Sequence, residues 1–107
     1  MKVKCEVLES RAQIRFALDR DSVCASDDFE THKVSVETYS FIDPVALAEE
    51  LSSGYLPRVA GDGHWWECIL NGIVIAKVFS NGKAEKVDDV RYAAENSVSF
   101  KYHSARF

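Results

Sequence analysis

The sequence predicts an α+β domain with a mostly antiparallel sheet of about five or six strands and one main helix. Two Asn-Gly pairs, at 71–72 and 81–82, stand ten residues apart between runs of β-forming residues. Several other segments alternate apolar and polar residues, which is the two-residue period of a strand. The segment 44–53 combines the apolar spacing of a helix with start and stop signals. Strands interrupted by one good helix are typical of the α+β class.

Alternating segments predict strands in the first half of the chain. Residues 2–8 and 13–18 alternate apolar and polar side chains, so each is predicted to be a half-buried strand. A helix that begins at Ser10 is the alternative for the second of these segments. Residues 19–32 are polar and are predicted to form a long loop. Residues 33–41 are rich in Val, Thr, Tyr and Phe, which favours a third strand.

The segment 44–53 carries the clearest helical signals. Asp43 suits the N-cap, Pro44 the first helical position, and Gly54 the position after the helix ends. The apolar residues recur at i, i+3, i+4 and i+7 and form one stripe, made of Pro44, Leu47, Ala48 and Leu51. We therefore expect this helix to pack one side against the sheet.

The two Asn-Gly pairs predict a three-strand antiparallel meander over 64–87. A two-residue type I′ turn needs a positive φ angle at both central positions, and Asn and Gly tolerate this best. Each pair is therefore predicted to form such a turn. The three strands are predicted at 64–70, 73–79 and 83–87.

Two more elements are predicted after the meander. Asp88 or Asp89 suits the N-cap of a short second helix over 89–95. Residues 97–103 alternate again and predict a final strand. Because no repeat, low-complexity tract or linker interrupts the sequence, we expect residues 1–107 to form a single compact domain.

With two-residue turns, Leu70 lies opposite Ile73 and Phe79 opposite Ala84, and this register separates the meander into two faces. One face is predicted to hold Trp66, Cys68, Leu70, Ile73, Ile75, Phe79 and Ala84. The other is predicted to hold Trp65, Glu67, Ile69, Val74, Ala76, Val78, Glu85 and Val87. Both sets are rich in apolar side chains, and one main helix does not cover both. We expect the loop 19–32, a curled sheet, a second copy or a partner protein to cover the second face.

Composition limits the possible functions. Apolar residues make up 47% of the chain, and the formal net charge is −4, which argues against non-specific nucleic-acid binding. Cys5, Cys24 and Cys68 form no C-x-x-C pair, so we expect no disulfide framework and no zinc site, and a cytosolic location. No apolar run approaches the roughly 18 residues of a membrane span, and no signal peptide is predicted. No motif predicts a cofactor.

The leading hypothesis is a small cytosolic protein-interaction module without catalysis, of the inhibitor, immunity or accessory type. It is expected to act through an apolar and acidic sheet surface, on another protein, on itself as a homodimer, or on both. Small bacterial and phage proteins are often built this way. Aromatic anchors dominate many interfaces. The contact residues are predicted to be Trp65 or Trp66, with Ile69, Val74 and Val78.

The alternative is a nucleic-acid-binding module that uses the C-terminal strand. Basic and aromatic residues interleave there, as on a platform for single strands: Lys101, Tyr102, His103 and Arg106. Strand alternation alone explains this pattern equally well, because it points aromatic side chains inward and Lys101 outward.

A third hypothesis is a small enzyme or ligand-binding protein. The sequence Gly-Asp-Gly-His precedes the two tryptophans, so Asp62 is able to orient His64 while an indole stacks on a ligand. Cys24 and His32 are the residue types of a nucleophilic pair, although no pattern supplies a third group. Gly61 and Gly63 are no phosphate loop, because they precede a predicted strand.

Overall fold

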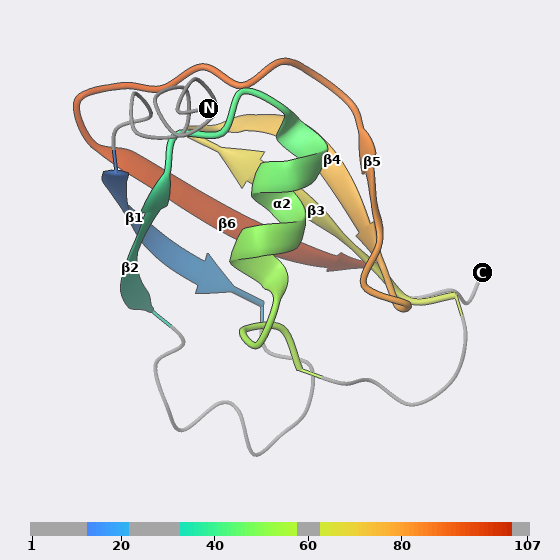
Figure 1. Cartoon of the computed structure of the whole chain (residues 1–107). Helices are drawn as coiled ribbons and strands as arrows, with labels where there is room; N and C mark the ends of the chain where they lie inside the picture. Colours follow the sequence, from blue (N-terminus) through green and yellow to red (C-terminus); the bar gives the residue numbers. More distant parts are fainter. Residues whose placement is uncertain (1–12, 22–32, 58–62, 104–107) are drawn as a thin grey trace, which may run out of the picture.

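We describe the chain from a computed structural model, which covers residues 13–21, 33–57 and 63–103. The elements are β1 (Gln13–Arg20), β2 (Val34–Tyr39), α2 (Pro44–Ser52), β3 (Trp65–Leu70), β4 (Ile73–Phe79), β5 (Ala84–Lys86) and β6 (Asn96–His103). The strands form one sheet with α2 against one of its faces (Figure 1). The predicted strand at 2–8 lies outside the described residues.

The strands lie in the order β2-β1-β6-β3-β4-β5. Neighbouring strands are antiparallel except for β1 and β6, which are parallel. The predicted α+β class with a mostly antiparallel sheet is confirmed, although the parallel pair makes the sheet mixed. The competing helix from Ser10 is wrong over the described residues 13–20, which form β1.

The helix α2 follows the predicted signals closely. Asp43 Oδ1 accepts a hydrogen bond of 2.9 Å from the backbone N–H of Val45, and Pro44 begins the helix. The helix ends at Ser52, with Ser53 as its C-cap and Gly54 at a φ of +76°. A left-handed residue after the last turn favours glycine because a Cβ atom is strained there.

The turn between β3 and β4 is tied to β6. Asn71 and Gly72 have φ angles of 50° and 87°, as a type I′ turn requires. Asn71 Oδ1 accepts a 2.9 Å hydrogen bond from Ser97 N–H, and Asn71 Nδ2 donates one of 2.9 Å to Asn96 Oδ1. The Asn71 side chain therefore links this turn to the start of β6.

The predicted pairing of β3 with β4 is wrong beyond the first two pairs. Leu70 lies opposite Ile73 as expected, but the register shifts between Cys68 and Ile69, so that Cys68 pairs with Ala76. Ile75 is the extra residue of a β-bulge. Ile75 and Ala76 are 1% and 0% exposed, so both are buried beneath α2 instead of pointing to opposite faces.

The pairing of β4 with β5 also differs by one residue from the prediction. Val78, not Phe79, lies opposite Ala84. Gly82 N–H donates to Phe79 O at 2.9 Å, and Gly82 has a φ of 88° whereas Asn81 has no positive φ. This is a three-residue loop with glycine in the left-handed position rather than a two-residue type I′ turn. Asn81 Oδ1 accepts from Lys83 N–H at 2.9 Å, which holds Asn81 in the turn.

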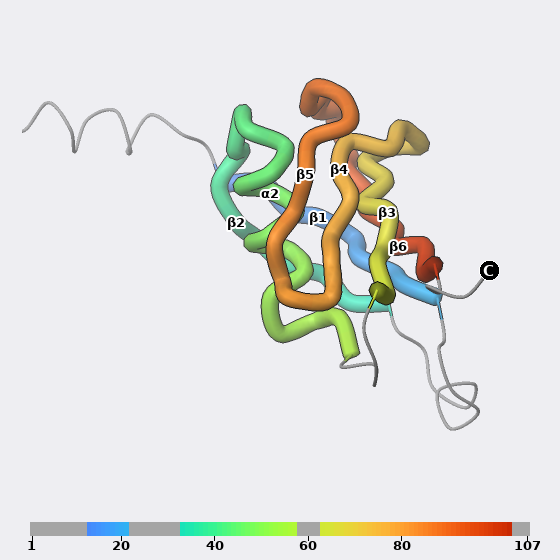
Figure 2. The backbone as a smooth tube through the Cα atoms, turned by 90° about the vertical axis from the view of Figure 1, so that its right-hand side faces the viewer, coloured from blue at the N-terminus to red at the C-terminus, as the bar shows by residue number. Residues whose placement is uncertain are grey.

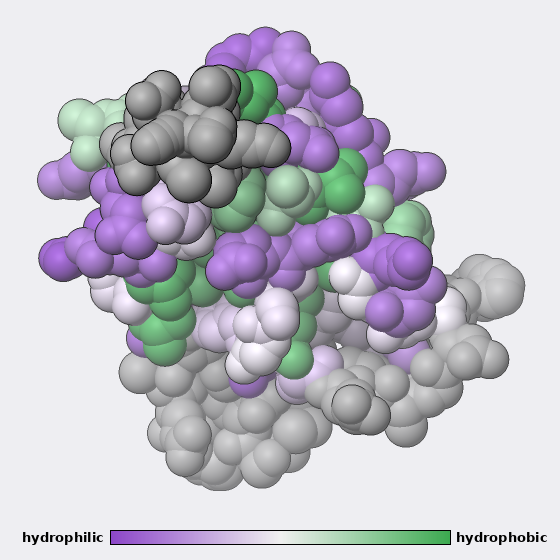
Figure 3. All heavy atoms as spheres, viewed as in Figure 1, coloured by the Kyte–Doolittle hydropathy of each residue, from purple (hydrophilic) through white to green (hydrophobic). Residues whose placement is uncertain are grey.

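The predicted second helix at 89–95 is wrong, because these residues form an irregular connection (Figure 1). The connection passes the ends of β4 and β3, about 14 Å across three strand spacings. Tertiary hydrogen bonds hold it: Tyr92 Oη donates to Phe41 O at 2.6 Å, and Ala93 N–H donates to Asn96 Oδ1 at 2.8 Å. Hydrophilic side chains run along the edge made by β5 and this connection (Figure 3).

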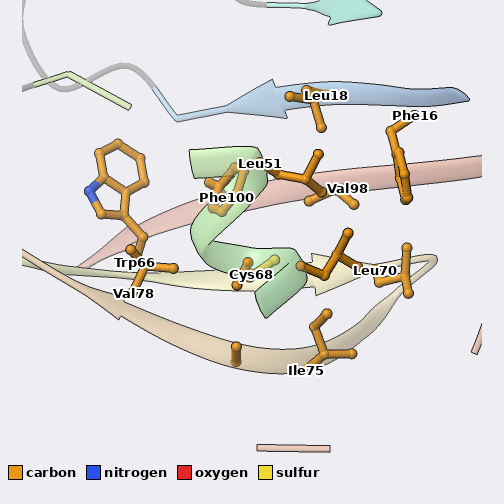
Figure 4. Packing of buried hydrophobic residues seen from close by; sticks show 13 residues of the cluster. Phe16, Leu18, Leu51, Trp66, Cys68, Leu70, Ile75, Val78, Val98 and Phe100 are labelled. Atoms are coloured by element: carbon orange, nitrogen blue, oxygen red, sulfur yellow. The ribbon is translucent and has the colours of Figure 1, made fainter. Parts of the chain in front are cut away.

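The described core lies between α2 and the sheet. The strands direct their buried side chains toward the helix, as Figure 4 shows for Phe16, Leu18, Trp66, Cys68, Leu70, Val98 and Phe100. Leu47 and Leu51 meet them from α2 and are 0% and 4% exposed. Burial of such side chains contributes roughly 1.5–3 kcal/mol each, so this layer stabilises the described part of the chain.

Candidate functional site

The candidate site is the face of β6, β3, β4 and β5 that points away from α2, called here the open face. In the described part of the chain, α2 lies on one side of the sheet only (Figure 2). The pairing of the strands assigns to the open face Ser97, Ser99, Lys101, His103, Trp65, Glu67, Ile69, Val74, Lys77, Phe79 and Glu85.

The bulge makes this face more polar than the sequence predicts. Ala76 and Val78 are expected on the same face as Trp65, but the register shift at Ile75 turns them toward α2. Phe79 moves in the opposite direction and becomes the neighbour of Trp65. The prediction of two largely apolar faces is therefore wrong, because it assumed unbroken alternation along β4.

One end of the open face carries an aromatic row, formed by His103, Trp65 and Phe79 on β6, β3 and β4. The rings of Trp65 and His103 stack with centroids 4.1 Å apart and planes 12° from parallel. The Nζ atom of Lys77 lies 5.0 Å from the centroid of the Trp65 ring, in a cation–π contact. Phe79 is 37% exposed. The indole of Trp65 is thus held in place on two sides before any partner binds.

The next row of the face is charged, with signs that alternate from strand to strand. Register places Lys101, Glu67, Lys77 and Glu85 side by side on β6, β3, β4 and β5. Among the described residues, neither lysine forms an ion pair with Glu67, and Glu85 forms none. We call these four residues the charged row.

Glu67 interacts instead with the aromatic row. Its Oε1 atom lies 3.2 Å from Nε2 of His103, and the two side chains are 26% and 30% exposed. No well-aligned hydrogen bond reaches this shielded nitrogen. The contact is therefore mainly electrostatic, and it becomes an ion pair when the imidazole carries a proton.

An aliphatic pair continues the face beyond the charged row. Ile69 and Val74 lie opposite each other on β3 and β4 and are half-buried. Farther along, on β1 and β2, Arg15 Nη2 and Glu37 Oε2 form an exposed ion pair at 3.1 Å. An exposed pair of this kind contributes little to stability. The apolar part of the face is thus a strip on β3 and β4.

The residues predicted to bind a protein are divided between the two sides of the sheet. Trp65, Ile69 and Val74 lie on the open face. Trp66 and Val78 are 4% and 2% exposed and pack in the core. Of the two tryptophans, Trp65 is therefore the one placed to act as an anchor.

The residues predicted for nucleic-acid binding are also divided. Lys101 and His103 lie on the open face, whereas Tyr102 points to the other side, where its ring packs edge-on against Trp66 at 5.2 Å. Arg106 lies outside the described residues. Because acidic side chains alternate with the lysines in the charged row, no continuous basic path crosses this face.

On the α2 side, His64 lines a pocket of about 380 Å³ with Trp66, Glu49 and Ser52 among its walls. Nδ1 of His64 lies 2.5 Å from Oη of Tyr102. Glu49 Oε2 accepts a 2.9 Å hydrogen bond from Ala84 N–H, which fixes this carboxylate beside β5. The other residues of the third hypothesis, Asp62, Cys24 and His32, lie outside the described residues.

The described cysteine is Cys68, which is buried in β3. Burial disfavours the thiolate and raises the pKa of this thiol from 9.0 to about 12. Cys68 therefore behaves as a small hydrophobic side chain. Across the described ranges, no cluster of three or more His, Cys, Asp and Glu side chains is arranged to hold a metal ion.

Sequence reasoning missed the charged row and the role of His103 beside Trp65. The only local signal of the charged row is one outward-facing Glu or Lys in each of β3, β4, β5 and β6, which also fits ordinary solvent exposure. The row becomes visible only when β6 is placed next to β3. No described helix has the length and apolar character needed to cross a membrane.

Comparisons with protein-family models, curated proteins and solved structures found no match to this chain.

Proposed function

We propose that this chain is a cytosolic protein-interaction module that binds a protein surface through the open face and performs no catalysis. The observation that supports it is the aromatic row beside the charged row, on the side of the sheet that α2 leaves uncovered. This is the anatomy of many interfaces, in which an aromatic anchor is surrounded by charged groups that determine specificity. The class is that of small inhibitor, immunity or accessory proteins.

Trp65 is the proposed anchor. Its ring is already held by His103 and Lys77, so little side-chain entropy is lost when a partner covers it. Its exposed neighbour Phe79 adds apolar area at the same end of β4. A preorganised aromatic side chain of this kind is enriched among the residues that dominate binding energy.

The test compares Trp65→Ala with Tyr39→Ala, a matched control. Tyr39 is also an aromatic residue, is 45% exposed, and lies on the edge strand β2 away from the proposed strip. Immobilised chain captures its binding partner, whether a second copy or another protein, and titration then gives the dissociation constant. We expect Trp65→Ala to weaken binding at least about fivefold and Tyr39→Ala to leave it unchanged. Equal binding by both variants would refute the proposal.

The pocket at His64 favours a second candidate function, the binding of a small molecule. Glu49 is the charged group in the described wall, and Trp66 supplies an aromatic surface, so a small cationic ligand fits this chemistry. A Trp65→Phe variant leaves Trp66 as the single tryptophan and reports binding by its fluorescence. A saturable change with a cationic probe that Glu49→Gln abolishes supports this function. An unchanged signal across a panel of cationic probes refutes it.

A further inference from the structure

We propose that the open face binds a second copy of itself across a two-fold axis that runs parallel to the strands, between β3 and β4. This inference rests on the proposed function, because it names the occupant of the same face. A rotation about such an axis places β3 opposite the partner's β4, and β6 opposite the partner's β5. Each row of side chains that crosses the strands then lies opposite the same row of the partner.

The charged row is self-complementary under this rotation. Glu67 faces the partner's Lys77, and Lys77 faces the partner's Glu67. At the ends of the row, Lys101 faces the partner's Glu85. Because the signs alternate over an even number of strands, the rotation places an opposite charge against each member of the row. Complementary charges of this kind specify register and orientation at an interface.

The apolar groups match under the same rotation. Trp65 on β3 faces the partner's Phe79, and Ile69 faces the partner's Val74, because each pair lies on the two strands that the axis exchanges. Aromatic and aliphatic side chains on β3 and β4 thus form the centre of the contact. The charged ends of the row lie toward its rim.

Charge disfavours a two-fold axis that is perpendicular to the strands and passes through the charged row. Such an axis leaves each strand opposite itself, so Lys77 would face the partner's Lys77 and Glu67 the partner's Glu67. Like charges in direct contact oppose association strongly. Two sheets that pack face to face with nearly aligned strands cross at about 30°, so the pairs nearest the axis, Glu67 with Lys77, are the best aligned.

The charged row is also available for pairing between copies. Lys101, Lys77 and Glu85 form no ion pair among the described residues, although register places them beside opposite charges. The overlap covers β6, β3, β4 and β5, which have 8, 6, 7 and 3 residues, so strand rise and spacing give roughly 400 Å² on each copy. A total of roughly 800 Å² is below the range of stable specific interfaces, so we expect a weak dimer that dissociates on dilution.

Two charge reversals test the pairing between copies. Lys77→Glu and Glu67→Lys each place like charges opposite one another in a homodimer, so we expect each variant alone to dimerise at least about tenfold more weakly than the wild type. In an equimolar mixture, the introduced lysine of one variant faces the introduced glutamate of the other, and every pair of the row is again opposite in charge. Light scattering of the mixture should therefore show the dimer restored to wild-type strength.

The mixture also serves as the folding control, because a misfolded variant does not regain a partner. Glu37→Lys is the matched surface control, since this exposed carboxylate lies on β2 outside the overlap, and its dimer should match the wild type. A wild-type dimer that both reversals leave intact, or a mixture that stays monomeric, would overturn the inference. A wild type that is monomeric at millimolar concentration also overturns it. In that case Trp65-dependent capture of another protein still supports the proposed function. If no protein is captured either, both the homodimer and the proposed function are refuted.

Discussion

The buried thiol of Cys68 leads to a quantitative prediction about stability at alkaline pH. The folded chain holds the pKa of this thiol at about 12, against 9.0 for an ordinary thiol. Between these two values the unfolded chain releases the proton while the folded chain retains it. The folded state is then the one that binds more protons, so its stability falls as the pH rises.

The size of this effect follows from the two pKa values. Each pH unit above 9.0 costs the folded state about 1.4 kcal/mol, up to the folded pKa of about 12. From pH 8 to pH 10 the thiol therefore contributes a loss of about 1.4 kcal/mol. Below pH 8 the contribution is constant, because both states are then protonated.

Urea unfolding of the wild type and of Cys68→Ala, at pH 8 and pH 10 with a reductant present, measures this loss. The substitution itself lowers stability by a fixed amount through the cavity it leaves, and all other titrating groups are common to the two chains. We expect the stability advantage of the wild type to shrink by about 1.4 kcal/mol at the higher pH. An advantage that stays constant would show that the thiol is not shielded from water in the folded state, and the described packing of β3 against α2 would be wrong.

Substitutions at three further positions test the fold by urea or thermal unfolding. Asp43→Ala removes the cap of α2 and should cost about 1 kcal/mol, whereas Asp43→Ser should restore most of it. Asn71→Gly keeps the left-handed turn but removes its side-chain bonds to β6, at a cost of about 1–3 kcal/mol, and Asn71→Ala should cost about 1 kcal/mol more through backbone strain. Leu47→Ala should cost about 2–5 kcal/mol because this side chain is fully buried beneath the sheet. A Leu47→Ala loss below about 0.5 kcal/mol, as at an exposed site, would contradict the packing of α2.

Local sequence signals predicted the helix and several strands, because the formation of these elements depends mainly on residues that are close together in the sequence. The N-cap hydrogen bond of Asp43 and the left-handed Gly54 are determined within a few positions of the chain. The bulge at Ile75 is different. The alternation of apolar and polar residues in β4 does not predict the bulge. The carbonyl of Ile75 accepts hydrogen bonds of 2.7 and 3.1 Å from the N–H groups of Val87 and Asp88, which belong to a later segment of the chain. Its position is therefore a tertiary effect, and the face assignments that depend on it could not be predicted locally.

The sequence predicted the residues of the candidate site that lie near the Asn71-Gly72 turn, but not the way in which β6 joins them. Trp65, Ile69 and Val74 could be named because the first pairs beside the Asn71-Gly72 turn are correct. Lys101 and His103 could be noticed but not grouped with them. Their grouping with Trp65 requires β6 to lie beside β3, a pairing between residues that are far apart in the sequence.

The position of β6 in the sheet has a consequence for how the chain is made. This segment comes last among the described elements, yet β2-β1 on one side and β3-β4-β5 on the other are joined by hydrogen bonds only through it. A growing chain that has not yet released residues 96–103 from the ribosome holds two incomplete sheets. Each presents an unpaired inner edge, β1 or β3, of the kind that recruits other chains into aggregates. The last described strand completes the sheet, so we expect the chain to be most prone to aggregation before residues 96–103 are available to pair with β1 and β3.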